Sequence, residues 1–289
     1  ALDRFTSFAP QITPAAVLAA MKREALALDK PLIRFEGRTA PTGGEKALRQ
    51  AWRQAMHAPL PAEQAAATAQ FAYTDFGTPG TVVSDKLDPL YGIREVRFAN
   101  GVMLNLKHTD ITRDRIAVSL AIDGGDMLDT RANPHATDMV PYMDEGGLGK
   151  HSRDELDTIM AGHTLGFGLG KGEASFAAQA GTTPRDLELQ LQLLTALITD
   201  PGYRAEGEVQ YRQQINNAFA SLRATPGSAM QADLGTIVSD NDPRFSLGKL
   251  EDYRQLTYAK LKADIGDRLA HGAIEVGITG DVAEDQGIA

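Results

Sequence analysis

Strict alternation of apolar and polar residues is the clearest pattern in this chain, and it begins near residue 93. Asn100-Gly101 lies between two alternating runs, and this dipeptide is typical of a tight β-hairpin turn. A third run, Ile116 to Ile122, ends before a pair of glycines. The alternating apolar positions of the first two runs are Val96, Phe98, Val102, Leu104 and Leu106. These runs predict three strands, the first two joined as a hairpin.

The later part of the chain shows helical periods and helix-start signals. Thr183-Pro184 supplies an N-cap and a first helical proline ahead of a leucine-rich run. Leucines alternate in that run as in a strand, but its cap, its length and its lack of β-branched residues among the leucines favour a helix. Helices are predicted over residues 135–144, 152–162, 183–199, 205–223, 226–238 and 257–271. A second hairpin is predicted from residues 164–170 and 173–178, and a last strand from 274–278.

Residues 1–60 predict a fragment that cannot form a core of its own. A helix starts at Thr13-Pro14, a short strand follows at Leu32 to Phe35, and a second helix covers residues 45–57. One strand between two helices needs a sheet elsewhere. We therefore interpret residues 1–60 as the C-terminal tail of a preceding module, and the chain as a piece excised from a longer polypeptide.

Residues 61–91 differ from both neighbouring segments because Pro, Ala, Gln and Gly are frequent in them. This composition predicts an inter-module linker. An extended segment packed on the next domain is the alternative, because Phe71, Tyr73 and Phe76 favour burial. Residues 92–289 are the main predicted domain. Strands come first there and hairpins replace βαβ crossovers, which predicts an α+β fold with an antiparallel or mixed sheet packed against a layer of helices.

Composition excludes several classes of function. The 289 residues contain no cysteine, so disulfides and thiolate zinc sites are excluded. The net charge is −9 and no Lys/Arg cluster is present, which argues against nucleic-acid binding. No apolar run of about 18 residues predicts a membrane span, and no signal peptide is visible.

The order of motifs after residue 96 resembles one module of the insulinase/pitrilysin family of zinc metallopeptidases. The resemblance covers about two-thirds of the chain. The matching segments are Phe98-Ala99-Asn100-Gly101-Val102, Gly124-Gly125, Gly147-Leu148-Gly149-Lys150-His151-Ser152, Asp200-Pro201 and Gly277-Ile278-Thr279-Gly280-Asp281. The resemblance implies the fold of a metallopeptidase half-module, which is LuxS/MPP-like.

The resemblance also implies a zinc site that this chain has lost. Active modules carry an inverted His-x-x-Glu-His motif on one helix face and a further Glu on a downstream helix. The corresponding positions here are Asp138, Pro141, Tyr142 and Ala218. Tyr142 is a poor zinc ligand, Ala218 has no ligand atom, and Pro141 cannot act as a base. No His-x-x-x-His pair occurs in the sequence. We therefore expect no catalytic, cofactor-binding or metal-binding residue in this segment, and zinc only in the catalytic half of the parent protein.

A makeshift metal site built from the helix predicted at 135–144 is an alternative. His135 and Asp138 lie one turn apart there, and Asp144 and Glu145 follow. A solvated polar helix face is the favoured interpretation of the same residues.

Other polar residues give no stronger hypothesis of chemistry. Gly166-x-Gly168-x-Gly170 is interpreted as part of a hairpin, because the Gly-Lys-[Ser/Thr] end of a phosphate-binding loop is missing. His163 and His271 are expected to cap helix or strand ends. Ser152 and Ser175 have no His/Asp partner at a recognisable spacing.

The resemblance implies a non-catalytic domain of a zinc metalloendopeptidase that forms part of the chamber enclosing a peptide substrate. Its partners would be the catalytic half of the same polypeptide and the peptide. A non-catalytic scaffold or assembly subunit of the same fold is the alternative, and an independent enzyme with an unrecognised site is a third. The residues do not identify a compartment; the resemblance favours a bacterial periplasm or envelope, where similar large proteins usually occur.

Overall fold

The computed structural model describes residues 7–24, 32–37, 39–58 and 70–288. The chain divides into two compact units, residues 1–65 and 66–289.

The first unit contains the short 3-10 helix η1 (Ala9–Gln11) and the helices α2 (Pro14–Glu24) and α3 (Gly44–His57). Thr13 caps α2 as predicted, since its Oγ1 accepts a hydrogen bond from the Ala16 amide at 3.2 Å. The strand predicted at Leu32 to Phe35 is wrong, because the described residues of this unit offer no second strand to pair with. None of the described residues of this unit is buried.

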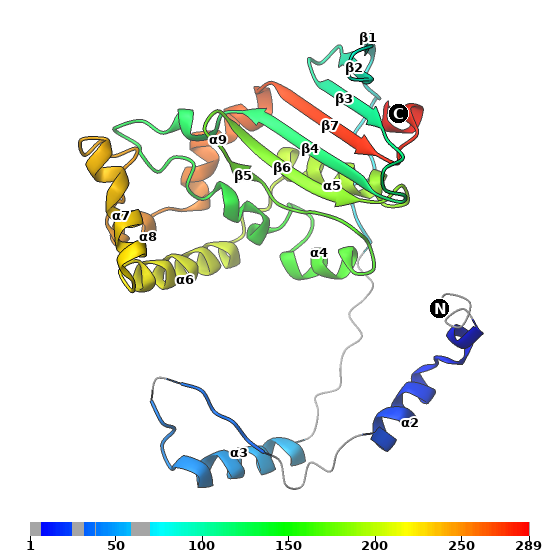
Figure 1. The fold of residues 1–289 in the computed structure, drawn as a ribbon. Helices are drawn as coiled ribbons and strands as arrows, with labels where there is room; N and C mark the ends of the chain where they lie inside the picture. The colour runs from blue at the N-terminus through cyan, green and yellow to red at the C-terminus, as the bar shows by residue number, and fades with distance from the viewer. Residues whose placement is uncertain (1–6, 25–31, 38, 59–69, 289) are drawn as a thin grey trace. The chain divides into compact units, whose positions relative to one another are not determined.

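A seven-stranded mixed sheet forms the centre of the second unit (Figure 1). The strand order is β1-β2-β3-β7-β4-β6-β5. Only β3 and β7 run parallel, while every other neighbouring pair is antiparallel. The strands are β1 (Val82–Asp88), β2 (Ile93–Phe98), β3 (Met103–His108), β4 (Ile116–Asp123), β5 (Gly170–Lys171), β6 (Ser175–Thr182) and β7 (Ile274–Gly280). The predicted α+β class with a mixed sheet is confirmed.

One face of the sheet carries the core. The alternating residues of β4 are buried on that face, where α5 and α9 pack against the sheet, while Ala117 and Ser119 lie on the open face. The remaining elements are η2 (Gly125–Leu128), η3 (Val140–Gly146), α4 (Arg153–Met160), α5 (Leu187–Thr199), α6 (Ala205–Ser221), α7 (Pro226–Val238), α8 (Leu250–Arg254), α9 (Tyr258–His271) and α10 (Glu284–Ile288). Helices α6, α7 and α8 gather beyond one end of the sheet (Figure 1). Among the described residues, no helix is both long and apolar enough to cross a bilayer.

The sheet extends into the segment 61–91, which was predicted to be a linker. Residues 61–69 lie outside the described part, but Val82–Asp88 forms β1 and pairs with β2. Tyr73 is buried, and its hydroxyl donates to Asp200 at 2.6 Å and accepts from the Lys150 amide at 2.7 Å. The described residues of this segment therefore belong to the domain, as the alternative of a packed extended segment proposed, and the domain begins before residue 92.

Local side-chain contacts explain where two helices begin. Ser152 and Glu155 form a capping box at the start of α4, as the Ser152 cap predicted. Helix α5 starts at Leu187, later than Thr183, because Thr183 and Asp186 first close a turn through the Asp186 amide and the Thr183 carbonyl.

The helix predicted over residues 135–144 is wrong. The chain runs through turns up to residue 139 and then forms the 3-10 helix η3 from Val140. Pro141 sits in the first turn of η3, where a missing amide hydrogen costs nothing, whereas in the interior of an α-helix over residues 135–144 it would remove a backbone hydrogen bond. Asp138 and Tyr142 are therefore not placed on one face of an α-helix.

The second predicted hairpin is shorter than expected. Only Gly170 and Lys171 pair with β6. Gly166 is held instead by the Gln190 side chain of α5, which accepts from the Gly166 amide at 2.7 Å and donates to its carbonyl at 2.8 Å. These two hydrogen bonds from the Gln190 side chain take the place of strand pairing at Gly166.

Candidate functional site

The position that resembles the first zinc ligand, Asp138, lies in an ion cluster around the Lys171 ammonium. Lys171 Nζ lies 2.7 Å from Asp138 Oδ1 and 2.9 Å from Asp126 Oδ1. Asp129 Oδ2 lies 3.8 Å from the same nitrogen. The second oxygen of Asp138 is 2.8 Å from His135 Nδ1. A single side-chain cation of the protein therefore lies among three carboxylates at this place.

The two inner carboxylates of this cluster are well buried. The Asp129 side chain is 5% exposed and that of Asp138 is 20% exposed. Asp129 also accepts hydrogen bonds from the Thr137 amide at 3.1 Å and from the Thr137 hydroxyl. The Thr137 hydroxyl accepts from Lys171 at 3.3 Å. The cluster thus ties the loop after η2 to the turn at β5.

Burial and charge oppose each other in the pKa values of these groups. Burial raises the pKa of Asp138, but His135 and Lys171 outweigh it and hold that pKa below its ordinary value. Burial lowers the pKa of Lys171, yet Asp138 and Asp126 raise it above its ordinary value. Burial dominates at Asp129, whose pKa is raised although Lys171 opposes the shift. Lys171 and Asp138 therefore form a charged pair at neutral pH.

The position that resembles the second histidine, Tyr142, is a packing residue. Its ring meets the Tyr211 ring of α6 edge to face, with centroids 4.9 Å apart. Its backbone carbonyl accepts a hydrogen bond from the Tyr258 hydroxyl. Burial raises the pKa of Tyr142, and the Asp138 charge raises it further, so the phenol stays protonated. Pro141, next to it, is exposed and offers no side-chain base.

The downstream helix predicted to carry the last ligand does pack against this segment. Helix α6 contacts η3, and its fully buried Tyr211 packs on Tyr142 there. Ala218 lies about two turns farther along α6 and is exposed. Pro141 and Tyr142 thus lie in η3 and Ala218 in α6, two elements in contact, but Ala218 lies about two turns beyond Tyr211. The sequence reasoning missed Lys171 and Tyr211, which carried no motif.

The alternative metal site does not assemble around His135 and Asp138. Asp144 turns to Arg153, with 2.7 Å between Asp144 Oδ2 and Arg153 Nη1. In the part of the chain that the structure describes, no group of three or more His, Cys, Asp or Glu side chains is placed to hold a metal ion.

The remaining candidates serve local structure. His163 Nδ1 lies 2.8 Å from the buried Asp186, and His271 Nδ1 lies 3.1 Å from Asp267. Ser152 caps α4. Ser175 begins β6, where it pairs with Asp123 of β4.

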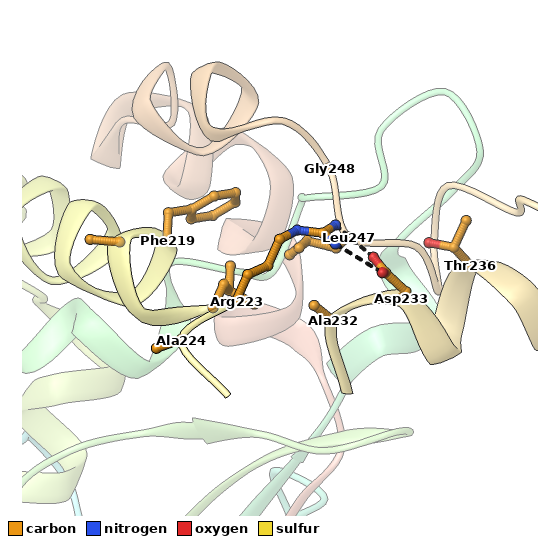
Figure 2. Close-up of a pocket in the computed structure, with 10 residues that line it drawn as sticks. Phe219, Arg223, Ala224, Ala232, Asp233, Thr236, Leu247 and Gly248 are labelled. Carbon is orange, nitrogen blue, oxygen red and sulfur yellow. Dashed lines mark hydrogen bonds and ion pairs between the residues drawn. The ribbon is translucent and has the colours of Figure 1, made fainter. Parts of the chain in front are cut away.

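Three cavities surround the loop between α7 and α8. The first, of about 380 Å³, lies between α6 and α7, and the ion pair Arg223–Asp233 spans it at 2.7 Å (Figure 2). The second, of about 610 Å³, shares Gly248 with the first. The third, of about 660 Å³, contains Asp138 and Lys171 and shares His135 with the second. His135 therefore stands between the cavity of the Lys171 cluster and the second cavity.

Comparison with solved structures identifies the fold. A mutant of the ferredoxin protease FusC, solved in complex with Arabidopsis ferredoxin, matches with a TM-score of 0.62 and 13% identity over 95% of this chain and 27% of that one. The periplasmic protease PqqL from Escherichia coli matches with a TM-score of 0.60 and 17% identity over the same shares. A peptidase M16 inactive domain from Pseudomonas fluorescens matches with a TM-score of 0.57 and 16% identity over 68% of this chain and 48% of that one.

Sequence comparison gives a further relative. The chain is 24% identical over 212 residues to the chloroplastic stromal processing peptidase of Arabidopsis thaliana, which covers 72% of this chain and 17% of that protein. No family model matches the chain. The chain spans about a quarter of the length of FusC and PqqL, and less of the curated relative. The fold is that of M16 peptidase domains, so the resemblance to insulinase/pitrilysin modules is confirmed at the level of fold.

Proposed function

We propose that this chain is a non-catalytic domain of a longer zinc metallopeptidase and forms part of the wall that encloses a peptide substrate. The observation that carries this proposal is the Lys171 ammonium among Asp126, Asp129 and Asp138. This ammonium lies beside Asp138, the position that resembles the first zinc ligand. A zinc cation bound there would be repelled by the positive charge of Lys171.

The chemistry of the donor set supports the same conclusion. A catalytic zinc needs three protein ligands and an open position for water. Here Asp138 is committed to His135 and Lys171, Tyr142 packs on Tyr211, and Ala218 has no donor atom. These residues do not fit a zinc ion.

The relatives suggest the setting of such a domain. FusC was solved with a protein bound, and PqqL is a periplasmic protease. Since this chain corresponds to about a quarter of either, we propose that zinc and the catalytic residues reside in another part of the parent polypeptide. We further propose a bacterial envelope as its compartment, by analogy with PqqL.

The purified chain should carry well below one zinc per chain after dialysis, and it should cleave no peptide. Metal analysis and incubation with casein or quenched fluorescent peptides at micromolar protein measure both. An unstructured peptide should nevertheless bind without being cut, which fluorescence anisotropy detects. Chelator-sensitive turnover that follows the protein through purification would overturn the proposal.

Restoring the ligand side chains should not restore the site. The variant Asp138→His/Tyr142→His/Ala218→Glu is expected to bind zinc no better than the wild type. Positions 138 and 142 do not share a helix face, the Lys171 charge remains, and Ala218 lies two turns beyond the contact with η3. Zinc titration of both proteins is the measurement, with thermal unfolding as the folding control. A gain of about tenfold or more in zinc affinity would show that these positions do converge.

A further inference from the structure

The space above Gly248 is bordered by two acceptor atoms that come from distant segments. A Cβ atom added to Gly248 would lie 3.0 Å from His135 Nε2 and 3.4 Å from Asp252 Oδ2. Both atoms therefore lie next to the face of Gly248 that carries no side chain, and the three residues line one place in the cavity of about 610 Å³. We call this place, formed by His135, Gly248 and Asp252, the Gly248 cradle.

His135 is held so that Nε2 faces this space. Its Nδ1 is engaged by Asp138 at 2.8 Å, and its ring rests on Tyr253 with centroids 4.6 Å apart. The side chain is 14% exposed, and no described residue makes a hydrogen bond to Nε2. With Nδ1–H donating to the Asp138 carboxylate, the other nitrogen of a neutral imidazole is an acceptor. The cradle thus offers an oriented acceptor without a protein donor.

The charges around the cradle leave a place for a cation. Asp252 contributes a carboxylate whose only described hydrogen bond comes from the Lys249 amide at 2.9 Å. Lys260 lines the same cavity, but its ammonium is paired with Asp264 at 2.7 Å. Lys171, beyond His135, is paired with Asp126 and Asp138 and lies near Asp129.

We propose that the Gly248 cradle binds the cationic side chain of a lysine or arginine in an extended polypeptide. The N–H groups of the cation would donate to His135 Nε2 and to Asp252 Oδ2, and hydrogen bonds of this charge-assisted kind are the strong ones. The cleft of about 610 Å³ that contains the cradle has room for such a side chain. This inference rests on the proposed function, since it names a feature of the peptide that the wall recognises.

Two fluorescent peptides test the cradle with the full chain. Both are unstructured decapeptides of one sequence, with either lysine or glutamine at the central position and no other charge. Anisotropy titration should show about tenfold tighter binding of the lysine peptide, because glutamine has similar length but no charge.

Gly248→Ala should remove this preference by filling the cradle. The backbone at Gly248 does not have a positive φ, so alanine fits the local conformation. Gly266→Ala is the matched control, because a Cβ there meets nothing within 4 Å, and it should keep the tenfold preference. Asp252→Asn preserves the shape of the cradle and should reduce the preference to about threefold or less. Thermal unfolding of each variant reports folding.

The outcomes separate this inference from the proposed function. The cradle would be overturned if the wild type bound the two peptides equally, or if the preference survived in both Gly248→Ala and Asp252→Asn. Either result would leave the proposed peptide-binding wall intact. Absence of binding to either peptide would overturn the wall and the cradle together.

Discussion

Replacing Arg204 by alanine is expected to lower the free energy of unfolding by roughly 3–5 kcal/mol. Arg204 lies at the start of α6, and its guanidinium donates to the backbone of the turn between η3 and α4. The acceptors are the carbonyl oxygens of Gly146, Leu148, Gly149 and His151. Without the guanidinium these carbonyls lose their charged donor, and three of the four belong to buried residues, Gly149 being the exposed one.

Urea unfolding monitored by circular dichroism measures this loss. Arg204→Lys should recover less than half of it, because an ammonium cannot reproduce the planar fork that reaches four oxygens. Arg223→Ala is the matched control, since that arginine forms one exposed ion pair with Asp233. It should change the free energy of unfolding by no more than about 0.5 kcal/mol. If Arg204→Ala lowered the free energy of unfolding as little as Arg223→Ala, the prediction would be wrong. Water would then hydrogen-bond to the four carbonyls as well as the arginine does.

The central strands could be predicted because their pattern is local. Every second residue of Ile116–Asp123 is buried against α5 and α9, so the sequence itself alternates. The segment 135–144 could not be predicted in the same way. Its polar residues have helical spacing, but Pro141 and the contacts of Asp138 with Lys171 decide its shape, and Lys171 is 33 residues away.

The sequence predicts which positions correspond to the zinc ligands, but it does not predict the contacts that these residues make. The sequence indicates Asp138 and Tyr142 where ligands are expected, but it does not indicate what replaces the metal. Lys171 follows Gly170 in a segment that reads as a simple hairpin turn, and Tyr211 reads as one aromatic residue in a polar helix. Long-range pairing brings Lys171 to the three carboxylates and Tyr211 to Tyr142. No local pattern encodes either contact.

Lys171→Met should cost roughly 2–4 kcal/mol of unfolding free energy at pH 7.5. Methionine keeps most of the length and the apolar stem of lysine but leaves Asp129 and Asp138 without their cation. Removing one partner of a buried ion pair costs more than the pair contributes, because the other charge stays desolvated. Lys260→Met is the control: Lys260 pairs with Asp264 one helical turn away at the surface, and its loss should cost at most about 0.5 kcal/mol.

The cost of Lys171→Met should shrink as the pH falls from 7.5 to 5. In the wild type the pKa of Asp138 lies below its ordinary value, so the stability it contributes persists above the unfolded-state pKa of about 3.9. Without the ammonium, burial raises the pKa values of Asp138 and of Asp129, where burial already dominates. Carboxyls with raised pKa values bind protons in the folded state first, so acid restores more stability to the variant than to the wild type, in which the pKa of Asp138 is lowered. Urea unfolding of both proteins at pH 7.5, 6 and 5 gives the difference directly. If the difference in unfolding free energy between the two proteins stayed constant over this range, Lys171 would stabilise the fold through the packing of its apolar stem. The charge of its ammonium would then no longer explain why this place does not fit a zinc ion.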